Sequence, residues 1–146
     1  MRVVIDTNLL IDGAKDDFNY GNRIIDEVIA GRIKAFANHA TLRENSLLAA
    51  KKISDQQYLQ KLSKFFEAVQ NVELSKKLDV VEDKEDNKLI ESAVAAQADY
   101  LISADRHLLK LGNYGKIQIV TPQEFWNRYE DETGTGWQKW INQFIK

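Results

Sequence analysis

The stretch VVIDTNLLID (residues 3–12) decides the fold, because a short apolar run is interrupted by a carboxylate. Residues 3–5 have the character of a buried strand, and Asp6, Thr7 and Asn8 follow before apolar residues resume. A capping role for Asp6 does not explain its place inside an apolar segment. We therefore interpret Asp6 as a candidate metal ligand at the end of a strand, with Thr7 and Asn8 either capping the next helix or orienting the acid.

The rest of the chain alternates between strand and helix patterns. Strands are expected at IKAFAN (33–38), LDVV (78–81), YLIS (100–103) and IQIVT (117–121). Helices are expected at about 24–30, in two parts of 41–69, at 84–97, at 105–111 and after Thr121. Ser54 or Asp55 is the expected cap of the second helix within 41–69, Thr121 is the expected cap of the last helix, and Gly31 is a helix stop. This alternation predicts an α/β fold with a parallel sheet covered by helices on both faces.

Composition narrows the functional classes. The chain has 146 residues, of which 44% are hydrophobic and 29% charged, so we expect one globular domain. It contains no cysteine, which excludes disulfides and thiolate metal sites. The net charge of −2 gives no overall attraction to nucleic acid, so such contacts must come from local basic groups or metal ions. No apolar run is long enough to cross a bilayer, and we expect a soluble, cytoplasmic protein without a membrane partner.

Four acids lie just beyond predicted strands. They are Asp6, Glu44, Asp86 and Asp105. The carboxyl ends of parallel strands meet at one edge of a sheet, so these acids should collect there. Clustered carboxylates oppose folding unless cations compensate them, and an all-oxygen set suits Mg²⁺ or Mn²⁺ better than Zn²⁺. Such ions activate water and stabilise leaving oxygens, which favours phosphodiester hydrolysis.

Some of these residues have alternative interpretations. Glu44 stands three residues after Thr41, as in a capping box, and Asp105 could cap the helix that follows it. Asp83 and Glu85 compete with Asp86, although the apolar run behind Asp86 favours the latter.

Other polar residues are weaker candidates. Ser103 and His107 are more typical of structural and surface positions, and Arg106 and Lys110 are candidates for phosphate contact. A further set of lysines is interpreted as a solvated face: Lys51, Lys52, Lys61, Lys64, Lys76 and Lys77.

Four segments together resemble a PIN-domain nuclease, especially the VapC kind of toxin. They are VVIDTNLLI, TLREN, EDKEDNKLIESAVAAQADYLISADRHLL and IQIVTPQEF, and the similarity runs over about residues 1–126. The resemblance implies a three-layer α/β sandwich with a mainly parallel central sheet and a divalent-metal site formed by Asp6, Glu44, Asp86 and Asp105. It also implies RNA cleavage to a 3′-hydroxyl and a 5′-phosphate, a cognate antitoxin and a homodimer. Asn45 and Ala104 depart from the pattern, which favours a larger apolar residue and a glycine at these positions.

Composition changes near the C-terminus. We expect a PIN-like domain over 1–129 and an extension over 130–146, in which Trp137, Trp140, Ile141 and Phe144 could form an apolar face for packing or for a partner.

Two rival functions are also compatible with the sequence. One is a PIN-fold module that binds or helps process RNA with little or no cleavage. The other is a phosphotransfer domain, which lacks support because no second acid follows two residues after Asp6.

Overall fold

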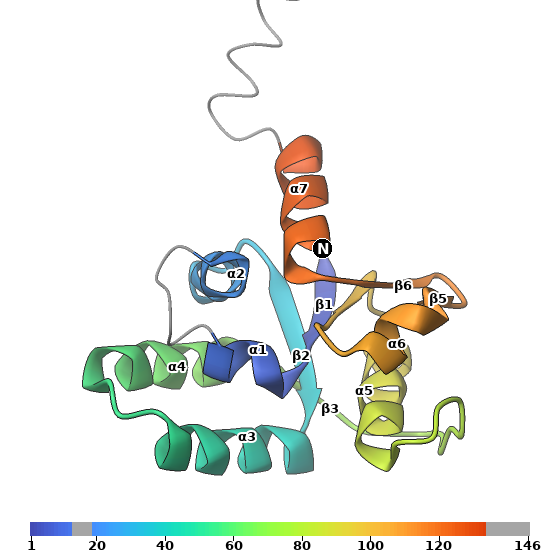
Figure 1. The fold of residues 1–146 in the computed structure, drawn as a ribbon, viewed down its shortest axis with the longest axis horizontal. Helices are drawn as coiled ribbons and strands as arrows, with labels where there is room; N and C mark the ends of the chain where they lie inside the picture. Colours follow the sequence, from blue (N-terminus) through green and yellow to red (C-terminus); the bar gives the residue numbers. More distant parts are fainter. Residues whose placement is uncertain (13–18, 134–146) are drawn as a thin grey trace, which may run out of the picture.

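The protein is built on a six-stranded sheet with the order β3-β2-β1-β4-β6-β5 (Figure 1). The computed structural model describes residues 1–12 and 19–133. Its strands are β1 (Arg2–Ile5), β2 (Lys34–Asn38), β3 (Gln70–Val72), β4 (Tyr100–Ile102), β5 (Asn113–Tyr114) and β6 (Ile117–Val120). All neighbouring strands run parallel except β5 and β6, which pair antiparallel. The prediction of a mainly parallel sheet is confirmed. The prediction of a strand at LDVV (78–81) is wrong, because the Val80 and Val81 amides bond to the side chain of Asn87 and not to a neighbouring strand.

Helices cover both faces of this sheet. They are α1 (Thr7–Asp12), α2 (Tyr20–Ile29), α3 (His39–Lys52), α4 (Gln56–Ala68), α5 (Lys84–Ala95), α6 (Arg106–Leu111) and α7 (Pro122–Thr133). Helices α1 to α4 and α7 contribute to one hydrophobic core, and α5 and α6 contribute to the other. Figure 1 shows α5 and α6 on the opposite side of the sheet from α2 and α4. The predicted three-layer α/β sandwich is therefore confirmed.

The two cores follow from the alternation of side chains along the central strands. In β1, Val3 packs into the core of α2 and α7, whereas Val4 packs against α5. In β4, Tyr100 and Ile102 face the first core and Leu101 faces the second. The side chains of successive strand residues point to opposite faces of the sheet. A run of consecutive apolar residues therefore indicates a strand that is buried on both faces of the sheet.

Polar residues define the helix ends. Asp55 caps α4 by accepting hydrogen bonds from the Gln57 and Tyr58 amides, as one of the two predicted alternatives. The Thr121 hydroxyl accepts from the Glu124 amide at 3.1 Å at the start of α7, as expected. Gly31 follows α2 with a φ of 80°, a conformation that a side chain disfavours.

The start of α3 differs from the prediction. Asn38 is the cap, with its side-chain oxygen accepting from the Thr41 amide at 2.8 Å. Thr41 is therefore inside the helix, which excludes the alternative interpretation of Glu44 as a capping-box partner of Thr41. Glu44 lies in the second turn of α3 instead of the first. An asparagine at the end of a strand is as good a cap as a threonine, and here it comes first along the chain.

The C-terminal segment is described only in part. Helix α7 runs to Thr133, beyond the boundary predicted at residue 129. The predicted apolar face of Trp137, Trp140, Ile141 and Phe144 lies outside the described residues. Within residues 1–12 and 19–133, no helix is both long and apolar enough to span a membrane.

Candidate active site

The centre of the sheet brings together the ends of two strands that are far apart in sequence. From β1 the chain continues to β2 and β3 on one side, whereas β4 leads to β6 on the other. A change of direction of this kind leaves a crevice at the carboxyl ends of the strands. The Asp6 amide donates to the Ile102 carbonyl at 3.0 Å, so the residues after β1 and β4 lie side by side.

Ser103 joins two of the predicted acids at this edge. Its hydroxyl donates to Asp6 Oδ2 at 2.8 Å and accepts from the Asp105 amide at 2.9 Å, and the residue is fully buried. Asp105 in turn caps α6 by accepting from the His107 amide at 2.8 Å. From the sequence, a structural role is the more typical one for a serine at the end of a strand. The structure shows that Ser103 also holds the Asp6 carboxylate and the backbone of Asp105 in place.

Asp86 faces the same edge from the first turn of α5. It is 7% exposed, and its Oδ2 atom is buried without a hydrogen-bond partner in the described residues. Burial, together with the charges of Asp105, Asp83 and Asp6, raises the pKa of Asp86 to about 6, and the charge of His107 opposes this rise. Asp6, Asp86 and Asp105 thus share one electrostatic environment.

The neighbours that competed with Asp86 are exposed to solvent, although the charge of Asp83 acts on Asp86. Asp83 is the exposed cap of α5 and accepts from the Glu85 amide at 2.8 Å. Glu85 is exposed and forms an ion pair with Lys88 at 3.2 Å. Only Asp86 among these three acids is buried against the sheet edge.

Glu44 differs from the other three acids in being exposed to solvent. It lies on α3, and its charge acts on Lys88, where it contributes to a raised pKa behind the larger effect of Glu85. The next residue, Asn45, is buried and accepts a hydrogen bond from the Thr7 hydroxyl at 2.5 Å. This pair ties α1 to α3 and explains why a polar residue is tolerated where the family pattern favours an apolar one.

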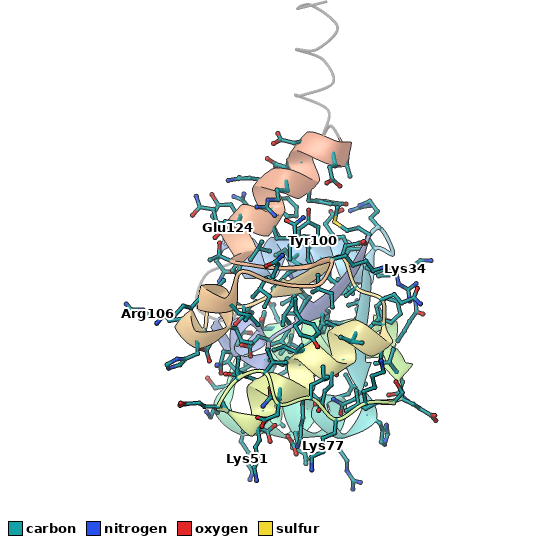
Figure 2. The ribbon with its side chains drawn as sticks, turned by 90° about the vertical axis from the view of Figure 1, so that its right-hand side faces the viewer. Lys34, Lys51, Lys77, Tyr100, Arg106 and Glu124 are labelled. Carbon is teal, nitrogen blue, oxygen red and sulfur yellow. The ribbon has the colours of Figure 1, made fainter. Side chains whose placement is uncertain are left out.

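Two open hollows lie near the candidate site, and one of them is lined by Asp105. One of about 330 Å³ is lined by Asn8, Ile11, Lys52, Ala104 and Asp105. Another of about 450 Å³ is lined by Val81, Glu82, Asp83 and His107. Figure 2 shows Arg106 pointing into solvent beside this region. Asp105 and His107 are therefore accessible to a large polar ligand.

The donor chemistry of the site fits a hard divalent cation. Carboxylate oxygens are the preferred ligands of Mg²⁺, and the buried Asp86 Oδ2 lacks any other partner in the described residues. In the same part of the chain, no three Asp, Glu or His side chains are gathered to form a preassembled metal site. Asp6, Asp86 and Asp105 are thus suitable ligands by burial and charge, but they stand apart in the structure.

The sequence was then compared with known proteins. The family model described as PIN domain matches residues 2–107. The chain belongs to the PIN domain family. This PIN-domain protein also resembles a crystal structure of VapBC2 from Rickettsia felis bound to a DNA fragment from their promoter. The similarity has a TM-score of 0.56 and 14% sequence identity, and it covers 83% of this chain and 98% of that chain, which shows a shared fold. A comparison with curated proteins gave no significant match.

Proposed function

We propose that this PIN-domain protein is a Mg²⁺-dependent endoribonuclease that hydrolyses phosphodiester bonds in RNA, with Mn²⁺ able to replace Mg²⁺. The observation that carries the proposal is the buried, unpartnered Asp86 Oδ2 in the electrostatic environment of Asp6 and Asp105. An isolated buried carboxylate is costly, and a protein retains one where it has a function. A bound divalent ion would lower the pKa of a water molecule bound to it and stabilise the leaving oxygen.

Each acid has a distinct part in this proposal. Asp6, Asp86 and Asp105 bind the ion, and Glu44 assists from the exposed face of α3. Ser103 is a positioning residue, because its hydroxyl fixes the orientation of the Asp6 carboxylate. The open hollow lined by Asp105 leaves space for part of a nucleic-acid strand. The products expected are a 3′-hydroxyl and a 5′-phosphate.

We also infer that the protein is the toxin of a toxin–antitoxin pair. Membership in the PIN family and the fold shared with VapBC2 support this assignment. A cognate antitoxin could inhibit the enzyme by placing a basic side chain among the three acids, where it would offset their mutual repulsion. A homodimer is part of the same proposal.

The alternative is a PIN-fold module that binds or helps process RNA without cutting it. It is favoured by one observation, which is that the acids are not gathered into a preassembled metal site in the described residues. Incubation of the protein with a mixed pool of single-stranded and structured RNAs, in Mg²⁺ and in excess EDTA, separates the two. The nuclease predicts fragments with 5′-phosphates in Mg²⁺ alone. Binding without fragments in either condition supports the alternative.

A further inference from the structure

A third hollow lies beside the candidate active site, on another face of α5. It has a volume of about 900 Å³ and is formed between this helix and the segment that precedes it. Its rim carries the lysines Lys76, Lys77, Lys84 and Lys88, and Leu74 and Leu78 contribute apolar surface. We call it the lysine groove. The sequence alone led us to interpret Lys76 and Lys77 as parts of a solvated face.

The four lysines that line the groove outnumber its two acids, Glu91 and the exposed Asp79. Lys76, Lys77 and Lys84 make no ion pair with any residue that the structure describes, whereas Lys88 is paired with Glu85. Of the two acids that line the groove, Glu91 is buried and its carboxylate accepts from the Leu78 amide at 2.7 Å. Unpaired lysines around a hollow are suited to binding a polyanion.

The groove is held in place by side chains of α5. The side-chain Oδ1 of Asn87 accepts hydrogen bonds from the backbone amides of Val80 and Val81 at 2.9 and 3.0 Å. The side-chain Nδ2 of Asn87 donates to the backbone carbonyl of Val81 at 2.7 Å. Together with Glu91, Asn87 fixes the segment that carries Lys76 and Lys77 against the helix. The groove is therefore a built feature of the fold, although its lysines are exposed.

The groove also continues toward the acids. Asn87 lines the groove and directly follows Asp86, so the groove and the candidate site occupy adjacent faces of one helical turn. Lys88 lies at their junction, since it lines the groove and its charge interacts with that of Glu44. Figure 2 shows Lys77 at the lower end of the molecule, far from Lys34 near the amino ends of the strands.

We propose that the lysine groove binds the single-stranded part of the RNA substrate, with Lys76, Lys77 and Lys84 contacting phosphates and the two leucines contacting a base. Lysines that follow a backbone and apolar surfaces that accept bases are the usual combination in single-strand binding. The proposal rests on the proposed function, because it assigns a path for the RNA of that same site. It also explains how a chain with a net charge of −2 can hold RNA.

The test measures RNA binding without cleavage. The anisotropy of a fluorescein-labelled single-stranded RNA of mixed sequence is titrated in EDTA with wild type and with a triple variant, Lys76→Gln, Lys77→Gln and Lys84→Gln. A matched control changes the same net charge elsewhere, with Lys34→Gln, Lys64→Gln and Lys116→Gln. All six lysines are exposed, so both variants are expected to fold, which thermal unfolding verifies.

The proposal predicts a large loss of affinity for the groove variant alone. Each phosphate contact on a single strand adds about 0.7 to the slope of log K against log salt, so the slope falls by about 2 and affinity at 0.1 M salt falls up to about 100-fold. Equal losses in the groove and control variants, no loss in the groove variant, or no binding by wild type would each overturn the proposal.

The same experiment distinguishes this proposal from the nuclease assignment. If wild type cuts no RNA in Mg²⁺ but the groove variant alone loses binding, the groove is an RNA site and the nuclease assignment fails. If wild type cuts RNA and the groove variant binds and cuts equally well, the nuclease assignment stands and the groove proposal fails.

Discussion

Removing the charge of Asp86 is expected to abolish activity and at the same time to stabilise the metal-free protein. The carboxylate is 7% exposed and its Oδ2 has no hydrogen-bond partner in the described residues. Ionised Asp86 therefore opposes folding, through its own burial and through repulsion from Asp105, Asp83 and Asp6. Asp86→Asn keeps the shape of the side chain and removes this repulsion.

The magnitude and its pH dependence follow from the pKa of Asp86. Its rise from 3.8 to about 6 means that the folded chain binds this proton more tightly than the unfolded chain. Ionisation of Asp86 therefore lowers the free energy of unfolding. This loss is absent below pH 3.8, grows between pH 3.8 and 6, and reaches its full size above that range. A rise of roughly two pH units corresponds to about 3 kcal/mol, and we expect about 1–3 kcal/mol because the asparagine amide needs its own partner.

Urea unfolding in EDTA at pH 8 and at pH 3.5 measures this effect. Asp86→Asn should unfold at higher urea than wild type at pH 8 and at nearly the same urea as wild type at pH 3.5. Asp131→Asn, which removes an exposed carboxylate from α7, serves as the control and should match wild type at both values. A variant that is less stable than wild type at pH 8, or that is equally stabilised at both pH values, would refute the reasoning.

Three further predictions concern the residues around the acids. Ser103→Ala removes the donor to Asp6 and should cost about 1–3 kcal/mol in urea unfolding and lower the cleavage rate more than the affinity for RNA. Asn87→Ala leaves the Val80 and Val81 amides without their partner and should speed their hydrogen exchange at least tenfold, with a smaller change in the β1 amides. Mg²⁺ should raise the melting temperature of wild type, because an ion that binds only the folded state stabilises that state. It should not raise the melting temperature of Asp86→Asn, which lacks a carboxylate proposed to bind the ion.

Much of the fold could be predicted because its signals are local. The apolar runs of β1, β4 and β6 and the helix caps at Asp55 and Thr121 are visible in the sequence and appear in the structure. Strands β3 and β5 were missed. They have three and two residues, and β3 is largely exposed, so neither carries the apolar alternation that identifies a strand.

The site was predictable in its acids but less so in its supporting residues. Asp6, Asp86 and Asp105 were expected at one edge, because parallel strands align their carboxyl ends. The structure places them in one electrostatic environment, although their catalytic role remains a proposal. The hydrogen bond of Ser103 to Asp6 and the pairing of Thr7 with Asn45 depend on contacts between residues 38 or more positions apart. No local pattern reveals such contacts, and the same is true of the exposure of Glu44.

Cleavage of RNA by matched variants tests the central proposal most directly. Wild type, Asp6→Asn, Asp86→Asn and the control Asp131→Asn are incubated with the mixed RNA pool in Mg²⁺, after each has been shown to be folded. We predict that wild type and the control produce fragments at similar rates and that both site variants lose at least a hundredfold in rate, as expected for ligands of an essential ion. Fragments produced by Asp6→Asn and Asp86→Asn at the rate of wild type would contradict the assignment of these acids to the active site.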